Sequence, residues 1–90
     1  MGTKKLLPTN QKEEVLFYLK RHGRITTMEA SNKLFIMDLQ SVIRLLRKSM
    51  TINDEWVYKK NIYGRPIRFK RYYIEPEDRL NLFERLRYFM

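Results

Sequence analysis

Residues 59–71 read KKNIYGRPIRFKR, and this stretch decides how the rest of the chain is interpreted. It contains no acid and six cations: Lys59, Lys60, Arg65, Arg68, Lys70 and Arg71. Residues 51–58 and 66–74 are rich in β-branched and aromatic side chains, and Gly64 lies in the short connection between them. Such a connection between two β-prone segments is typical of a hairpin. We therefore predict a basic β-hairpin whose turn lies at residues 61–65.

A helical pattern begins near the N-terminus of the chain. Asn10 is a good N-cap, and Glu13 stands three residues later, as in a capping box. The apolar residues Val15 and Leu19 then recur at helical spacing, and Gly23 is suited to end the helix. This pattern predicts the first helix.

Two more helices are predicted before the hairpin. Residues 24–26 are too few for more than a bridge strand, and either Thr26 or Thr27 can cap a second helix running to about Leu34. Asp38 can cap a third helix that runs to about Met50. Apolar residues of this third helix form one stripe: Leu39, Val42, Ile43, Leu46 and Met50. The opposite face is polar and basic: Gln40, Ser41, Arg44, Arg47 and Lys48.

The order of these elements predicts the fold class. Helix, short strand, helix, turn, helix and hairpin is the layout of an α+β winged helix-turn-helix, with a three-helix core, a short bridge strand and a β-hairpin wing. We assign residues 1–8 to a flexible tail, 9–75 to this domain and 76–90 to an added C-terminal amphipathic helix. The apolar stripe of that last helix is Leu82, Phe83, Leu86, Phe89 and Met90.

Charge and composition restrict the function. The 90-residue chain has 19 Lys+Arg against 10 Asp+Glu, a net charge of +9 that favours a polyanionic partner. It has no cysteine and one histidine, and no nucleophile, phosphate-loop or metal-ligand motif. We therefore expect a protein that is not an enzyme and needs no metal or cofactor. The absence of a long apolar run indicates no membrane span, and we expect a cytoplasmic protein.

The chain also resembles the small helix-turn-helix domain common in bacteriophage and prophage proteins. The resemblance covers residues 11–74 and rests on the motifs Val15-Leu16-x-Tyr18-Leu19, His22-Gly23-x-Ile25-Thr26-Thr27, Glu29-Ala30, Ile36-Met37, Ile43-x-x-Leu46-Arg47-Lys48, Ile52, Trp56-Val57 and Asn61-x-Tyr63-Gly64-Arg65. It implies DNA binding. Two residues depart from the pattern. Asp38 puts an acid at the start of the third helix, and Leu34 occupies a position where many helix-turn-helix proteins have glycine.

The predicted roles follow from this layout. A projecting helix fits the major groove of B-DNA, where arginine recognises guanine and glutamine recognises adenine. We expect base contacts from Gln40, Ser41 and Arg44. We expect phosphate contacts from Arg47, Lys48, Lys59, Lys60, Arg65, Arg68 and Lys70. Taken on one helix alone, these charges could equally keep an amphipathic surface soluble.

The aromatic and C-terminal residues are assigned structural roles. We expect Trp56 in the core. Tyr63, Phe69, Tyr72 and Tyr73 are expected in the core or in cross-strand pairs, rather than stacked on bases. The C-terminal stripe either completes the core or forms a two-fold dimer, and we favour the dimer because one small DNA-reading unit gives limited specificity.

Two functional hypotheses result. In the first, the chain binds double-stranded DNA as a phage or prophage transcriptional regulator or recombination accessory factor. In the second, it is a winged-helix interaction module whose basic face binds an acidic host protein, as a phage inhibitor or adaptor does.

Overall fold

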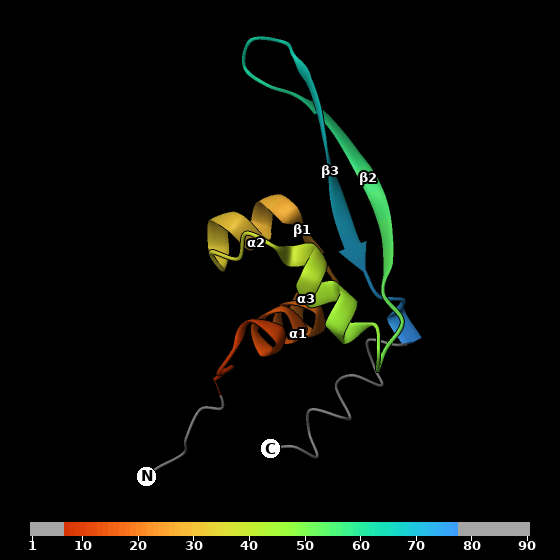
Figure 1. Ribbon diagram of the computed structural model, residues 1–90. Coiled ribbons are helices and arrows are strands. Elements are labelled where there is room, and N and C mark those ends of the chain that lie inside the picture. Colours follow the sequence, from red (N-terminus) through yellow and green to blue (C-terminus); the bar gives the residue numbers. More distant parts are fainter. Residues whose placement is uncertain (1–6, 78–90) are drawn as a thin grey trace.

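The structure is a computed structural model, which describes residues 7–77. Three helices pack together at the base of a three-stranded antiparallel sheet, and two of the strands extend beyond the helices as a long hairpin (Figure 1). This arrangement confirms the predicted α+β winged helix-turn-helix. The predicted tail (1–8) lies largely outside the described residues, as does nearly all of the predicted C-terminal helix (76–90).

Helix α1 (Gln11–His22) begins and ends where the sequence predicts. The Asn10 side chain accepts a hydrogen bond of 2.8 Å from the backbone N–H of Glu13. At the other end Gly23 has φ +80°, a left-handed conformation that glycine adopts without the steric cost of a side chain. Both predicted helix boundaries are therefore confirmed.

Strand β1 (Arg24–Thr26) leads directly into helix α2 (Thr27–Lys33). The structure decides between the two predicted caps, because the Thr26 hydroxyl accepts a hydrogen bond from the Glu29 N–H while the Glu29 carboxylate accepts one from the Thr26 N–H. This reciprocal pair is a capping box. Thr26 is therefore both the last residue of β1 and the N-cap of α2.

Helix α3 (Leu39–Leu46) is capped by Asp38, as predicted, but it ends earlier than Met50. The chain continues in a turn in which the Lys48 and Ser49 N–H groups donate to carbonyls three residues back. The early end still leaves Met50 packed against the core. The apolar spacing of the sequence therefore predicts the burial of Met50 correctly, although this residue lies beyond the end of the helix.

The sheet has the order β1-β3-β2, formed with strands β2 (Asn53–Lys60) and β3 (Pro66–Tyr73). The two strands pair along their whole length, from Asn53↔Tyr73 to Lys60↔Pro66, which confirms the predicted hairpin. Strand β1 pairs only with residues 71–73 of β3. At about 3.3 Å per residue the eight-residue strands are about 26 Å long, so most of the hairpin has no third strand beside it. We call residues 53–73 the wing.

The core lies between the helices and the base of the sheet. Its most deeply buried side chains are Val15, Leu19, Ile25, Ile36, Leu39, Ile43 and Leu46. The predicted apolar stripe of α3 is thus confirmed as core. Tyr72 is buried as well, whereas Tyr63 is 89% exposed. The expectation that Trp56 lies in the core is wrong: its side chain is 42% exposed, because its position on β2 lies beyond the pairing with β1.

Candidate nucleic-acid interface

One face of the wing carries an alternating series of cations and aromatic rings. Successive residues of a strand point to opposite faces, so Trp56 and Tyr58 share a face with their cross-strand partners Lys70 and Arg68. The Arg68 guanidinium carbon lies 4.2 Å from the centroid of the Trp56 ring, and Lys70 Nζ lies 4.6 Å from it. Both distances are within the range of cation–π attraction. We call Trp56, Tyr58, Arg68 and Lys70 the cation–aromatic ladder.

Asp54 joins this ladder to the end of α3. Its carboxylate accepts a hydrogen bond of 2.8 Å from Lys70 Nζ and one of 2.9 Å from the Arg47 guanidinium. Arg47 also donates twice to the carbonyl oxygen of Ile52, at 2.9 and 2.7 Å, and lies 5.8 Å from the centroid of the Tyr72 ring. The hydrogen bond from Lys70, and to a smaller extent the one from Arg47, lowers the pKa of Asp54. The Arg47 side chain therefore connects the end of α3 to the base of the wing.

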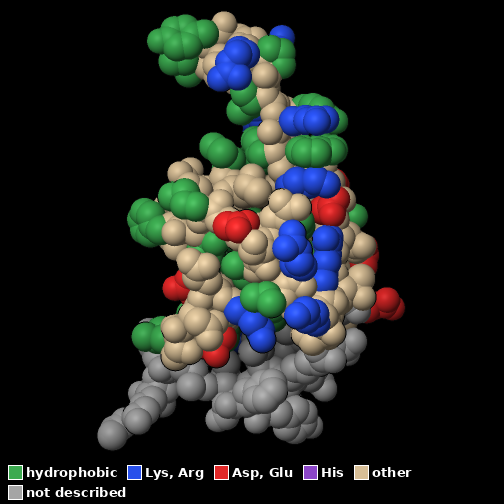
Figure 2. Space-filling model, viewed as in Figure 1, with side chains coloured by type: hydrophobic (Ala, Val, Ile, Leu, Met, Phe, Trp, Pro, Cys, Tyr) green, Lys and Arg blue, Asp and Glu red, His purple; other side chains and the backbone are tan. Residues whose placement is uncertain are grey.

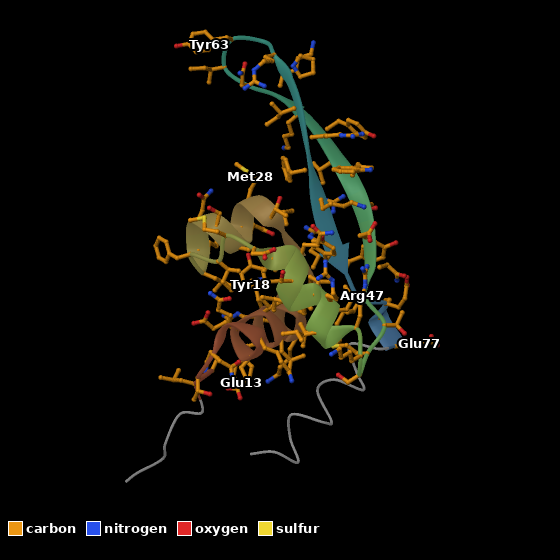
Figure 3. The ribbon with its side chains drawn as sticks, viewed as in Figure 1. Glu13, Tyr18, Met28, Arg47, Tyr63 and Glu77 are labelled. Atoms are coloured by element: carbon orange, nitrogen blue, oxygen red, sulfur yellow. The ribbon has the colours of Figure 1, made fainter. Side chains whose placement is uncertain are left out.

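These contacts bring the basic side chains at the end of α3 next to those at the base of the wing. Arg47 lies between α3 and the base of the wing (Figure 3). In the space-filling view, Lys and Arg side chains follow one another from the tip of the wing down over the helical body (Figure 2). Green hydrophobic side chains lie between them on the wing, and acidic side chains interrupt the series near its middle. The two basic elements thus lie on one side of the molecule and not back to back.

The exposed face of α3 has the composition that the sequence predicts. Gln40 and Arg44 are exposed, and so is Lys48 in the turn that follows the helix. Ser41 is only half-exposed, and its hydroxyl donates a hydrogen bond of 2.6 Å to Asp38. This hydrogen bond and a second one from the Ser41 N–H lower the pKa of Asp38, which is therefore ionised at neutral pH. Of the predicted base-contacting residues, Gln40 and Arg44 are available, whereas the Ser41 hydroxyl is engaged in the cap.

The outer wing holds cations that differ from those at its base. Lys59, Lys60 and Arg65 are exposed, and within residues 7–77 no salt bridge neutralises them. Arg71, in contrast, forms a 2.6 Å salt bridge with Glu55 on the other face of the sheet. The positive charge of the wing is therefore least compensated toward its tip.

A metal centre and a membrane-spanning helix are two further possibilities, and each can be compared with the part of the chain that the structure describes. Residues 7–77 contain no group of three His, Cys, Asp or Glu side chains placed to hold a metal ion. No helix among those residues is long and apolar enough to cross a membrane.

Helices, hairpin and basic surface together define the class of small winged-helix proteins. A family model for the winged helix-turn-helix domain matches residues 10–76, and the chain belongs to this family. A search of curated proteins gives no match. Domains of this family are typically DNA-binding modules without enzymatic activity, so membership supports DNA binding in general.

Sequence reasoning missed two residues of this interface, Asp54 and Trp56. The signal for Trp56 was present, since a turn at residues 61–65 sets a register that places it opposite Lys70. The same register places Asp54 diagonally across from Lys70, but its contact with Arg47 could not be found in this way, because Arg47 reaches it from another element.

Proposed function

We propose that the chain binds double-stranded DNA, with the polar face of α3 in the major groove and the wing along the adjacent backbone or minor groove. The observation that carries this proposal is the contact of Asp54 with both Arg47 and Lys70. It joins the two basic elements before any ligand is present. Elements that are already oriented lose less conformational entropy on binding.

Within this proposal the predicted contact residues take different roles. Gln40 and Arg44 read base edges, and Ser41 does so only where its hydroxyl leaves Asp38. Exposed cations contact phosphates: Lys48, Lys59, Lys60, Arg65 and Arg68. Arg47 and Lys70, which the sequence also assigned to phosphate, have much of their charge opposed by Asp54 and chiefly hold the interface in shape.

Binding to fluorescent duplexes, measured over a range of salt concentrations, tests the proposal. Five neutralised phosphates predict a slope of log K against log salt of about −4 to −5. Arg44→Ala should reduce the preference for selected over random sequence. The triple variant Lys59/Lys60/Arg65→Ala should weaken binding to all duplexes alike and flatten the slope by about 3.

Lys12→Ala is the matched control, because it removes one exposed cation from the start of α1, at the opposite end of the molecule from the wing tip (Figure 1). Its slope should equal that of the unaltered protein. If neither Arg44→Ala nor the triple variant changes DNA retention, the proposal is wrong.

The finer biological assignment is also a proposal. We propose a phage or prophage regulator or recombination accessory factor that acts in the cytoplasm, with residues 9–75 as the binding domain and residues 76–90 as a dimerisation helix. Selection of bound fragments from a random duplex pool tests it, since a dimer selects palindromic sites. A monomer in sedimentation at tens of micromolar would remove the dimer.

A second candidate function is the docking of an acidic host protein. Contact with a protein is favoured by two exposed apolar side chains in the connection between α2 and α3, Phe35 at 77% and Met37 at 80% exposure, while the basic face would meet the acidic groups of that partner. A gel shift at moderate salt with random-sequence competitor separates the two functions. A DNA-binding protein retains a selected duplex, whereas a protein-binding module releases it.

A further inference from the structure

The tip of the wing exposes two large apolar side chains side by side. Ile62 is 90% exposed and Tyr63 is 89% exposed, the highest values among the large hydrophobic residues in the described part of the chain. Tyr63 points away from the end of the hairpin, far from the helices (Figure 3). Exposed apolar side chains that adjoin each other commonly mark a contact with a ligand.

The backbone beneath these side chains is rigidly organised. The Asn61 side-chain oxygen accepts hydrogen bonds from the N–H groups of Tyr63 and Arg65, both at 2.9 Å. The Asn61 N–H donates to the Arg65 carbonyl and the Gly64 N–H donates to the Asn61 carbonyl, again at 2.9 Å. Gly64 completes the turn with φ +88°. These bonds close the loop on itself and leave Ile62 and Tyr63 outside it.

The charge around the tip indicates what these side chains contact. Lys59, Lys60 and Arg65 surround it, and residues 56–74 contain no acid. An apolar protein pocket would have to desolvate these cations. A DNA groove, in contrast, places phosphates on both sides of an apolar base stack, so it matches both the rim of cations and the apolar centre.

We propose that Ile62 and Tyr63 enter the minor groove as a wedge, separate two neighbouring base pairs and bend the duplex. Isoleucine is one of the side chains that separate base steps in this way, and such wedges kink DNA by about 20 to 90°. The adjacent cations hold the phosphates on either side of the step. The inference rests on the proposed DNA binding and adds to it a change in the shape of the DNA.

Ligase-catalysed ring closure of a duplex shorter than the persistence length of about 150 bp measures the bend. A stiff fragment of this length closes slowly, so a protein that bends it increases the yield of small circles. The unaltered protein should increase that yield at concentrations that saturate the fragment. The variant Ile62→Ser/Tyr63→Ser should bind with an affinity within about tenfold, because loss of apolar contact is offset by the avoided unstacking, and should give no increase.

The variant Ile62→Leu/Tyr63→Phe is the matched control, since it keeps the apolar volume and should retain ring closure. Both positions are about nine-tenths exposed, so an unchanged melting temperature is expected for each variant.

The measurements separate failure of the wedge from failure of DNA binding. If the unaltered protein does not shift the fragment in a gel, the proposed function fails. If it shifts the fragment without increasing the yield of circles, or if the double serine variant closes circles as well as the unaltered protein does, the wedge is wrong and DNA binding stands.

Discussion

The Arg68 guanidinium lies over the ring of Trp56, with its central carbon 4.2 Å from the ring centroid. Lys70 Nζ lies 4.6 Å from the same centroid, so one half-exposed indole contacts two cations. Each cation–π contact at an exposed site contributes about 0.5 to 1 kcal/mol. The indole therefore orients cations that would otherwise sample many rotamers on the open wing.

This relationship makes Trp56 a reporter of binding, since it is the only tryptophan of the chain. We expect added duplex DNA to shift its emission to shorter wavelength, because the DNA covers a ring that is 42% exposed to water. High salt should reverse the shift as the phosphate contacts are lost. A fluorescence titration measures it, and Trp56→Phe should abolish the signal while binding persists. Unchanged emission on a duplex that anisotropy shows to be bound would place the ladder away from the DNA.

Substitution of Arg47 should lower the free energy of unfolding more than substitution of Lys48. Arg47→Lys is expected to lower the free energy of unfolding by about 1 to 2 kcal/mol, since lysine cannot span the Ile52 carbonyl and Asp54 together. Lys48→Ala, the next residue and also exposed, should change it by less than about 0.5 kcal/mol. Urea unfolding of both variants measures the difference. Equal effects would mean that the contact between α3 and the wing contributes little.

Much of this fold could be predicted from the sequence because its signals are local. Asn10, Thr26 and Asp38 cap helices through bonds that span three residues, and Gly23 ends α1 through its own backbone. The hairpin could be predicted for the same reason, since its register follows from a turn at residues 61–65. Local signals of this kind require no knowledge of how elements pack.

The missed features depend on tertiary geometry. Trp56 was expected in the core because burial is the usual state of an indole, yet it lies where β2 has passed beyond β1 and the helices. The pairing of Arg47 with Asp54 likewise required the angle between α3 and the wing. A charge pattern identifies cations, but only the packed structure shows which of them already have an acidic partner.

The pH dependence of stability should show the contribution of the ionised Asp54 carboxylate. Its pKa is lowered by Lys70 and Arg47 from an ordinary value of 3.8, so its contribution to stability is present above that pH and is lost as the pH falls through the lowered pKa. Because the pairs are about one-third exposed, we expect a modest loss, below about 1 kcal/mol for each pair. Urea unfolding between about pH 6 and pH 2 measures it. Asp54→Asn should reduce the slope in this acid range, and parallel curves for the two proteins would contradict the assignment.

Removal of the charge at Asp38 should strengthen DNA binding. Asparagine caps helices about as well as aspartate, so Asp38→Asn preserves the start of α3 while it removes an ionised group close to the proposed phosphate contacts. We expect affinity for any duplex to rise several-fold at low salt, and less at high salt. Asp38→Ala serves as the comparison, since it removes the charge together with the cap and should lower the melting temperature. Unchanged affinity in both variants would place the N-terminus of α3 away from the phosphate backbone.

Replacement of Phe35 by glycine should stabilise the folded protein. It has φ +56°, and no other non-glycine residue in the described part of the chain has a positive φ. Its side chain is 77% exposed, so little packing is lost with it. Phe35→Gly removes the clash of Cβ with the backbone in this left-handed conformation and should raise the free energy of unfolding by about 0.5 to 1 kcal/mol. Met37→Gly, at a site that is 80% exposed with negative φ, should instead lower it by at least a similar amount. Glycine there adds freedom to the unfolded chain and removes the sulfur that accepts a hydrogen bond from the Ser31 hydroxyl. Thermal and urea unfolding of the two variants should therefore move in opposite directions, and a loss of stability in Phe35→Gly would show that the phenyl ring makes a contact worth more than the strain it imposes.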